Sequence, residues 1–192
     1  MMMPHPPVMD FLLTRRSRPA KLLSAPVPDR AGLDLLLTAA ARVPDHGKLE
    51  PWRFIVLHKP ALRRIAESVA ARAAEREMAP EQAAKGRSQF DDSPLAVAVI
   101  ASPKGFDRIP EIEQTLSAGA VCLSLVNAAL AAGWGASWLT GWAAHDRALM
   151  ADVLGLQPGE WVAGFVHIGT TDTAPAERPR PDIAAITTWI SE

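Results

Sequence analysis

At residues 42–52 the chain reads Arg42-Val43-Pro44-Asp45-His46-Gly47-Lys48-Leu49-Glu50-Pro51-Trp52. Two prolines and a glycine predict a loop in this stretch. The loop carries two cations, two carboxylates and an imidazole, and a simple connector rarely needs so many hydrogen-bonding groups. We therefore interpret the loop as the part around which the chain is organised, acting with the earlier basic triplet Arg15-Arg16-Ser17 to hold an anionic group.

The loop joins a predicted helix to a predicted strand. Asp29 has the side chain of an N-cap, and the helix that follows ends where Pro44 forces Val43 out of the α region. Beyond the loop, apolar residues 54–57 predict a short buried strand. Trp52 precedes that strand, and we interpret it as a core or lip aromatic. The apolar positions of the helix are Leu33, Leu36, Leu37, Ala40 and Ala41.

The basic triplet follows an earlier helix. Residues 8–14 carry apolar side chains at helical spacing, and Pro19 stops this helix after Arg15-Arg16-Ser17-Arg18. Cations suit the C-terminal end of a helix dipole, but three arginines in four positions exceed that need. We therefore predict a functional role for them. Residues 1–7 lack the apolar run of a signal peptide and are expected to be a disordered lead-in.

The rest of the chain alternates helices with apolar strands. Further strands are predicted at 95–101, 134–141 and 161–168. Further helices are predicted at 60–77, 111–132 and 145–154. Residues 78–93 are polar without a clear period, which indicates a mobile or lid segment. The alternation predicts an α/β or α+β class in one domain over residues 8–190.

Two segments are more apolar than a small monomer needs. The helix at 111–132 is apolar nearly all round after Leu116, which favours a buried helix over a membrane span. In a chain of 192 residues, a second subunit could cover part of that helix. The end of the chain, residues 183–190, is also too apolar to be free in water. It either docks on the body or reaches across to a partner.

Composition excludes several classes of function. The net charge of −1 gives no basic excess for nucleic acid, and 48% hydrophobic residues are ample for a core. A single cysteine, Cys122, excludes a disulfide framework within the chain and fits a reducing, cytoplasmic compartment. Its place in the most apolar helix predicts an inert thiol.

Motifs for most other chemistries are absent. The chain has no P-loop, no dinucleotide fingerprint and no nucleophile elbow, and its five histidines lack metal-ligand spacing. Asp91 and Asp92 are interpreted as a solvated pair. What remains is a set of phosphate-capable cations, tryptophans at strand ends and a helix that suits a dimer. This profile is typical of a protein that holds an organic cofactor, which then carries the reaction.

Several segments in this order resemble the nitroreductase family, in particular its small, single-domain bacterial branch. The resemblance covers residues 8–190. It rests on the segments Arg15-Arg16-Ser17-Arg18, Ala41-Arg42-Val43-Pro44-Asp45-His46, Pro51-Trp52-Arg53-Phe54-Ile55-Val56, Ser117-Ala118-Gly119-Ala120, Gly133-Trp134-Gly135-Ala136-Ser137-Trp138-Leu139-Thr140-Gly141 and Gly164-Phe165-Val166-His167-Ile168-Gly169-Thr170.

The resemblance implies an α+β fold with a central mixed sheet surrounded by helices, in an intertwined homodimer with FMN at the subunit interface. It implies a ping-pong cycle in which NADH or NADPH reduces FMN, which then reduces a small aromatic acceptor such as a nitroaromatic or a quinone. The implied cofactor does the chemistry, so no catalytic side chain, metal, membrane or nucleic acid is expected. Alternatives are an FMN carrier or sensor, and a related flavin enzyme that dehalogenates its substrate or destroys flavin.

The resemblance also implies roles for particular residues. Arg15, Arg16 and Ser17 would contact the ribityl-phosphate and the ring edge of FMN, while Arg42 and His46 would reach the FMN of the other subunit. The segment Trp138, Leu139 and Thr140 would line the isoalloxazine ring. Leu139 stands where a polar or basic residue is expected, so any contact from this position is expected through the main chain.

Overall fold

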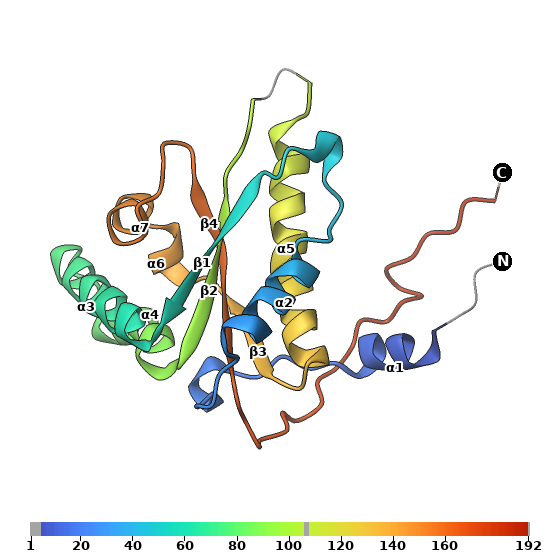
Figure 1. Cartoon of the computed structure of the whole chain (residues 1–192), viewed down its shortest axis with the longest axis horizontal. Coiled ribbons are helices and arrows are strands. Elements are labelled where there is room, and N and C mark those ends of the chain that lie inside the picture. Colours follow the sequence, from blue (N-terminus) through green and yellow to red (C-terminus); the bar gives the residue numbers. More distant parts are fainter. Residues whose placement is uncertain (1–4, 106–107, 192) are drawn as a thin grey trace.

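The computed structural model describes residues 5–105 and 108–191. Its centre is a four-stranded sheet in the order β1-β2-β4-β3 (Figure 1). The strands are β1 (Trp52–His58), β2 (Leu95–Ala101), β3 (Gly135–Leu139) and β4 (Trp161–Gly169). All pairings in the described sheet are antiparallel, so the expectation of a mixed sheet is corrected for this chain.

The sheet separates two hydrophobic cores because β2 is buried along its whole length. Successive side chains of a strand point to opposite faces, so Val97 and Val99 pack on one side of β2, and Ala98 and Ile100 on the other. This double burial explains the uninterrupted apolar run in the sequence of the strand.

Helices α2 (Arg30–Ala40) and α5 (Glu111–Ala131) cover the first face. Asp29 caps α2 as predicted, because its side chain accepts a hydrogen bond from the Gly32 N–H at 2.8 Å. Of the described helices, α5 alone has the length and hydropathy of a membrane span. Its inner side nevertheless packs on α2 and the sheet, which supports the prediction of a core helix.

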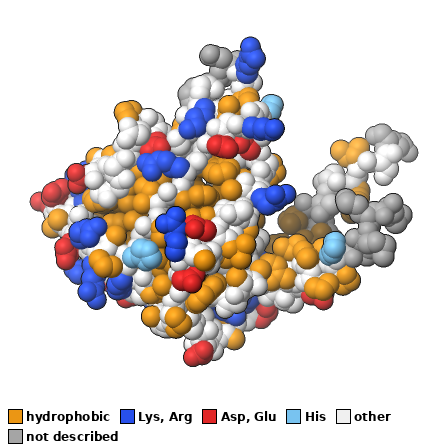
Figure 2. Space-filling model, in the orientation of Figure 1, with side chains coloured by type: hydrophobic (Ala, Val, Ile, Leu, Met, Phe, Trp, Pro, Cys, Tyr) orange, Lys and Arg blue, Asp and Glu red, His pale blue; other side chains and the backbone are white. Residues whose placement is uncertain are grey.

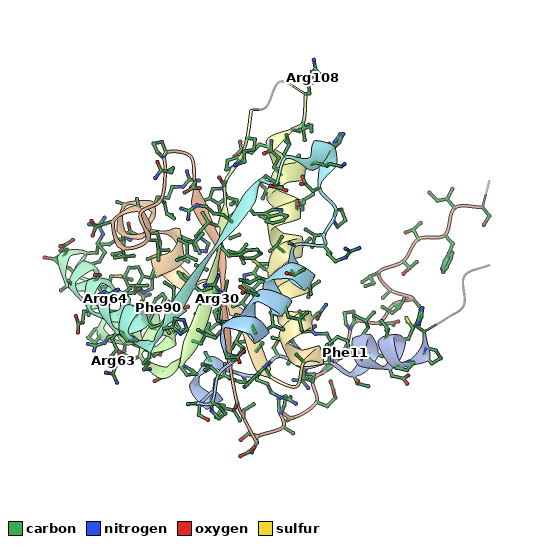
Figure 3. All side chains as sticks on the ribbon, viewed as in Figure 1. Phe11, Arg30, Arg63, Arg64, Phe90 and Arg108 are labelled. Carbon is green, nitrogen blue, oxygen red and sulfur yellow. The ribbon has the colours of Figure 1, made fainter. Side chains whose placement is uncertain are left out.

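Four helices cover the second face: α3 (Lys59–Glu75), α4 (Pro80–Asp92), α6 (Gly141–His145) and α7 (Arg147–Leu154). The prediction of a mobile or lid segment at 78–93 is wrong for most of its length, because α4 packs beside α3 as a regular helix. Phe90, fully buried, anchors α4 by an edge-on contact with Phe165 at a centroid distance of 5.1 Å (Figure 3).

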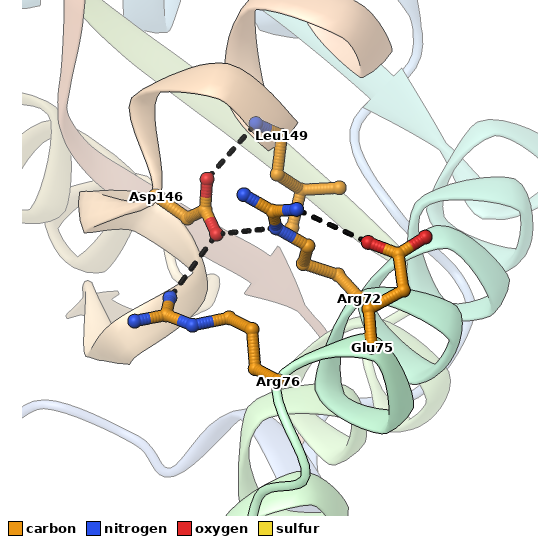
Figure 4. A network of polar contacts seen from close by, with 5 residues as sticks. All are labelled: Arg72, Glu75, Arg76, Asp146 and Leu149. Carbon is orange, nitrogen blue, oxygen red and sulfur yellow. Dashed lines mark hydrogen bonds and ion pairs between the residues drawn. The ribbon is translucent and has the colours of Figure 1, made fainter.

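A charged network ties α7 to α3 (Figure 4). The buried carboxylate of Asp146 caps α7 by accepting the Leu149 N–H at 3.1 Å. It also accepts hydrogen bonds from Arg72 at 2.8 Å and Arg76 at 3.1 Å. The hydrogen bond from Arg72 is the largest cause of a lowered pKa of Asp146, so this carboxyl stays charged well below neutral pH.

We expect Asp146→Ala to lower the free energy of unfolding by about 2–4 kcal/mol, because it removes an N-cap and two charge-assisted hydrogen bonds. Urea denaturation followed by circular dichroism measures this change. The exposed Asp152 on the same helix is the matched control, and Asp152→Ala is expected to be nearly neutral. Equal stabilities of the two variants would contradict the assignment of this network as a stabilising one.

Two apolar segments project from the body. Helix α1 (Pro6–Thr14) has no buried residue, and the C-terminal tail after β4 runs alongside it (Figure 1). Hydrophobic side chains gather over α1 in Figure 2. In the tail, Ile183 is 65% exposed and Trp189 is 87% exposed, so the body of this chain does not cover them.

The described N-terminus differs from the expected lead-in. Helix α1 starts at Pro6, so it includes the last two residues of the stretch 1–7 that was expected to be disordered. Residues 1–4 of that stretch lie outside the described part of the chain.

Candidate functional site

The loop at residues 42–52 folds into a compact unit around Asp45. The carboxylate of Asp45 accepts hydrogen bonds from the backbone N–H groups of Leu49, at 3.1 Å, and Glu50, at 2.8 Å. Gly47 has a φ of +71°, and a Cβ at that position would collide with Ile109. Lys48 and Glu50 also have positive φ, a conformation that costs energy for residues with a side chain and is often found at functional sites.

The loop is fastened to α5. Ser117 donates a hydrogen bond to the carbonyl of Pro44 at 2.8 Å and accepts one from the indole N–H of Trp52 at 3.1 Å. Trp52 also packs against Phe54, which agrees with its interpretation as a core or lip aromatic. His46 remains mostly exposed and pairs through Nδ1 with Glu113 in the first turn of α5, at 2.6 Å. Arg42 is exposed.

The basic triplet lies at the free edge of β3. The backbone N–H of Arg18 donates to the carbonyl of Ala136 at 2.7 Å, which holds the segment after α1 beside that strand. Arg15 donates to the hydroxyl of Ser17 at 3.3 Å. Arg16 donates to the carbonyl of Ala176 in the C-terminal tail. The structure therefore brings the triplet together with the tail and β3.

The tail adds a third guanidinium to this group. Glu177 pairs with Arg16 at 3.3 Å and with Arg180 at 3.0 Å. Burial, and then the nearby charge of Arg180, lower the pKa of Arg15. The Nε of Arg15 is buried and has no hydrogen-bond partner in the described chain. Arg16 and Arg180 share the single carboxylate of Glu177, and Arg15 is close enough to Arg180 for the two charges to repel. A further anion would relieve the cost of this arrangement.

The predicted aromatic segment divides between the two faces of the sheet. Trp138 pairs with Val166 and points to the α5 face, where its indole N–H donates to the carbonyl of Ala163 at 3.2 Å. Gly164 lies beneath the indole, and a Cβ there would overlap it. Leu139 points to the opposite face, as expected for the next residue of a strand.

A pocket of about 590 Å³ opens on the side of Leu139. It lies between the short helix η1 (Ala20–Leu22), α4 and the turn from β3 to α6. Leu139 and Thr140 line it from the turn, and Pro19 and Ala20 continue from the basic triplet into its wall. The pocket therefore adjoins the arginine cluster through a few residues of chain, and its lining is mostly apolar with a few polar groups.

Several polar residues of this region were not predicted as site residues from the sequence, among them two lysines, a glutamine and an arginine. Lys21, Lys85 and Gln89 line the pocket, and Arg180 joins the arginine cluster from the tail. The only signal for Arg180 is a second cation at 178 in a proline-rich tail. Lys85 and Gln89 lie in the segment 78–93, where no periodicity marked a helix.

Not all predicted residues meet within this chain. Arg15, Arg16 and Ser17 lie near β3, and Leu139 and Thr140 lie at its end. His46 lies instead at the first turn of α5, a helix about 30 Å long at 1.5 Å per residue, whose last turn precedes β3. No described hydrogen bond or ion pair joins Arg42 or His46 to the triplet.

A buried pair of polar side chains lies on the neighbouring strands β3 and β4. Ser137 and His167 are opposite each other on β3 and β4, so their side chains share a face. The hydroxyl of Ser137 and both ring nitrogens of His167 are buried without a partner in the described chain. Burial lowers the pKa of His167 from 6.5 to about 4, so the imidazole is neutral at pH 7.

We expect the stability of the protein to fall by about 3 kcal/mol between pH 6.5 and pH 4 because of His167. The unfolded chain binds a proton near pH 6.5, whereas the folded chain binds it only near pH 4, so acid favours unfolding in this window. Urea midpoints measured across this range test it. His167→Leu should remove that part of the slope, while His58→Leu, at an exposed histidine, should leave it. The same acid slope in His167→Leu as in the wild type would refute the assignment.

Two other kinds of reactive site, a cysteine thiol and a metal centre, were also considered for the described part of the chain. Burial raises the pKa of the Cys122 thiol to about 12, so this thiol is inert as predicted. Among residues 5–105 and 108–191, no group of three or more His, Cys, Asp or Glu side chains could hold a metal ion.

An antiparallel sheet covered by helices on both faces, with an arginine cluster along the edge strand β3 and a largely apolar pocket at the end of that strand, defines an α+β protein. The sequence model of the Nitroreductase family matches residues 12–170. The chain belongs to this family.

Curated relatives and solved structures agree with this assignment. The "Putative NAD(P)H nitroreductase" of Haemophilus influenzae is 32% identical over 84% of this chain and 87% of its own length. The protein of that name, YdjA, in Escherichia coli K12 is 28% identical over the same shares. The crystal structure of a nitroreductase-like family protein from Bacillus cereus superposes with a TM-score of 0.81, at 21% identity and with full coverage of both chains. The crystal structure of a "putative nitroreductase in complex with FMN" from Desulfovibrio desulfuricans has a TM-score of 0.73 at 19% identity, over 96% of this chain and 97% of its own.

Proposed function

We propose that this protein is an FMN-dependent NAD(P)H oxidoreductase that reduces small aromatic acceptors such as nitroaromatics or quinones. The observation that carries the proposal is the buried, unpartnered Nε of Arg15, which lies near the charge of Arg180 and only a few residues along the chain from Pro19 and Ala20 in the pocket wall. A dianionic phosphate matches guanidinium donors, and an apolar pocket suits a flat ring. The FMN in the Desulfovibrio structure and the names of the curated relatives support this choice of cofactor.

Two groups of residues would contact opposite ends of the cofactor. Arg15, Arg16 and Arg180 would hold the phosphate, and Ser17 would contact the ribityl chain. The ring would enter the pocket against Leu139 and Thr140, whose main-chain groups are expected to contact its edge. Bound FMN would take a hydride from NADH or NADPH and pass it to the acceptor. The chain's own part is to orient the ring, exclude water and place cations near the charge that reduction adds.

Two lysines support the last of these roles, the placement of cations near the charge that reduction adds. Lys21 on η1 and Lys85 on α4 both line the pocket and face it from different elements. A positive charge near the ring stabilises its reduced, negatively charged form. We therefore assign these lysines to the tuning of the cofactor rather than to proton transfer.

We propose that the site is completed by a second copy of the chain. The outer side of α5 leaves Leu116 65% exposed and Leu123 48% exposed. Trp138 borders this side of α5, and α1 and the tail add further uncovered apolar surface. A homodimer would bury these groups and could bring Arg42 and His46 of one subunit to the arginine cluster of the other. This arrangement explains why the two groups are separate within one chain.

A mixed dimer tests this cross-subunit arrangement. One subunit carries His46→Ala and the other carries Arg15→Ala with Arg16→Ala. If sites combine residues of both chains, one pocket receives every lesion and the other is intact, so the dimer should keep half of its FMN. Absorbance of the doubly tagged, purified heterodimer measures this ratio, with the two homodimeric variants as controls. Damage at both sites, from His46→Ala in one and from the arginine changes in the other, would place His46 and the triplet in the same chain's site.

Anaerobic spectroscopy tests the function as a whole. The purified protein should be yellow, should lose its flavin absorbance when NADH or NADPH is added without oxygen, and should regain it with a nitroaromatic or a quinone. A yellow protein that neither nucleotide bleaches would support an FMN carrier or sensor instead. A colourless protein that does not bind added FMN would reject every flavin-based proposal.

A further inference from the structure

Gln89 on α4 is a buried amide in the wall of the pocket. Its residue exposure is 9%, and its Nε2 donates to the carbonyl of Thr140 at 3.0 Å, with a longer contact to the carbonyl of Gly86 at 3.5 Å. Because carbonyls take up the nitrogen end, the orientation of the amide is fixed. Its Oε1 is buried and receives no hydrogen bond in the described chain.

The surroundings hold this amide in place. A Cβ on Gly86 would overlap the indole of Trp142, whose N–H donates to the carbonyl of Gln82 at 3.2 Å, so α4 lies very close to α6. A Cβ on Gly141, where φ is +82°, would lie 3.4 Å from the Nε2 of Gln89. The side chain therefore has little freedom to turn its oxygen toward another donor, and that oxygen is preorganised for a ligand.

Among the described residues that line the pocket, Gln89 alone has a buried side-chain polar atom without a partner. The lysines of the same pocket can only donate hydrogen bonds. The polar edge of an isoalloxazine ring carries several acceptors and, in the oxidised form, one donor, the N3–H of its imide. The lysines suit the acceptors, and Gln89 suits the donor.

We infer that Oε1 of Gln89 accepts a hydrogen bond from the imide N3–H of the flavin ring and so selects a ring with this donor at that edge. The inference rests on the proposed FMN site and assigns a specificity-determining contact within it. A site with a fixed, buried acceptor discriminates against an analogue that lacks the matching donor, because the acceptor is then left unpaired.

Binding of FMN and of 3-methyl-FMN to the apoprotein tests this contact without any turnover. Quenching of flavin fluorescence gives both dissociation constants. The wild type should bind FMN about tenfold to a hundredfold more tightly than 3-methyl-FMN. Gln89→Met keeps the length of the side chain but removes its acceptor, so the preference should shrink to about twofold or less. Gln82→Met, at an exposed position of the same wall, is the matched control and should keep the full preference.

A second measurement separates a hydrogen bond from a steric effect of the added methyl group. FMN labelled with ¹⁵N at N3 should show an N3–H resonance protected from exchange with water in the wild type and in Gln82→Met. Fast exchange in the wild type, or equal protection in Gln89→Met, would overturn the inference, as would a wild type without preference between the two flavins. In each of these cases tight FMN binding would leave the proposed function intact, whereas failure to bind FMN at all would remove both.

Discussion

Replacing both Arg15 and Arg16 with alanine is expected to raise the dissociation constant for FMN by about 10²–10⁴-fold. Each charge-assisted hydrogen bond to a phosphate contributes about 1.5–3 kcal/mol, so two of them give about 3–6 kcal/mol. The fold should tolerate the change, because Arg16 is held by the exposed tail and the Nε of Arg15 has no partner to lose. Removing the crowded Arg15 charge also relieves its repulsion with Arg180.

Flavin fluorescence titration measures this effect. Arg63→Ala with Arg64→Ala is the matched control, because these exposed arginines of α3 (Figure 3) carry the same charge and do not line the pocket. The control should bind FMN as the wild type does. Equal affinity of the Arg15/Arg16 variant and this control would show that the phosphate binds elsewhere.

Salt offers a further check of the same assignment. Ion contacts with a phosphate weaken as ionic strength rises, since the Debye length falls from about 10 Å at 0.1 M to about 3 Å at 1 M. The affinity of the wild type for FMN should therefore fall with salt more steeply than that of the Arg15/Arg16 variant. Parallel salt dependences would argue that the triplet supports the fold and not the cofactor.

The regular elements could be predicted because their signals are local. The uninterrupted apolar run at 95–101 gives β2 with the bounds expected, and Asp29 caps α2 as its side chain suggests. The turn chemistry of the loop at 42–52 is local too, since Asp45 bonds the backbone N–H groups of Leu49 and Glu50, close by in the chain. Such features need no knowledge of which elements meet.

Helix α4 escaped prediction because tertiary contacts, and not its own pattern, stabilise it. It has few large apolar residues and includes Gly86, which lowers helix propensity. Its position depends on the ring contact between Phe90 and Phe165 and on the absence of a side chain at Gly86, which leaves space for the indole of Trp142. Both partners lie more than fifty positions away in the chain. The pocket wall that α4 forms could therefore not be located from the sequence.

The sequence indicated which types of residue form the candidate site, but it did not indicate which of them meet in space. The triplet was recognisable by its unusual density of charge, but its third guanidinium, Arg180, comes from a tail far away in the chain. For Trp138 and Leu139, alternation along β3 sends the two side chains to opposite faces, so only Leu139 reaches the pocket. Trp138 instead lies on the α5 side of the sheet, at the surface that we expect the partner subunit to cover.

Replacing both Leu116 and Leu123 with glutamate is expected to convert the proposed dimer into monomers and to remove FMN binding at the same time. Burying a leucine stabilises an interface by about 1.5–3 kcal/mol, and in a two-fold dimer each residue counts twice. Losing two leucines therefore removes about 6 kcal/mol or more, which corresponds to an increase of about 10⁴-fold in the dimer dissociation constant. The added charges oppose burial further.

Sedimentation velocity with detection at the flavin wavelength reports mass and cofactor together. Ala71→Glu with Ala74→Glu adds the same charge to exposed positions of α3 and should leave both unchanged. The wild-type arginine cluster and pocket remain whole in the Leu116/Leu123 variant, so loss of FMN from its monomers must come from groups that the partner no longer supplies. Monomers that keep FMN at wild-type affinity would show that one chain forms the complete site, and Arg42 and His46 would then need another role.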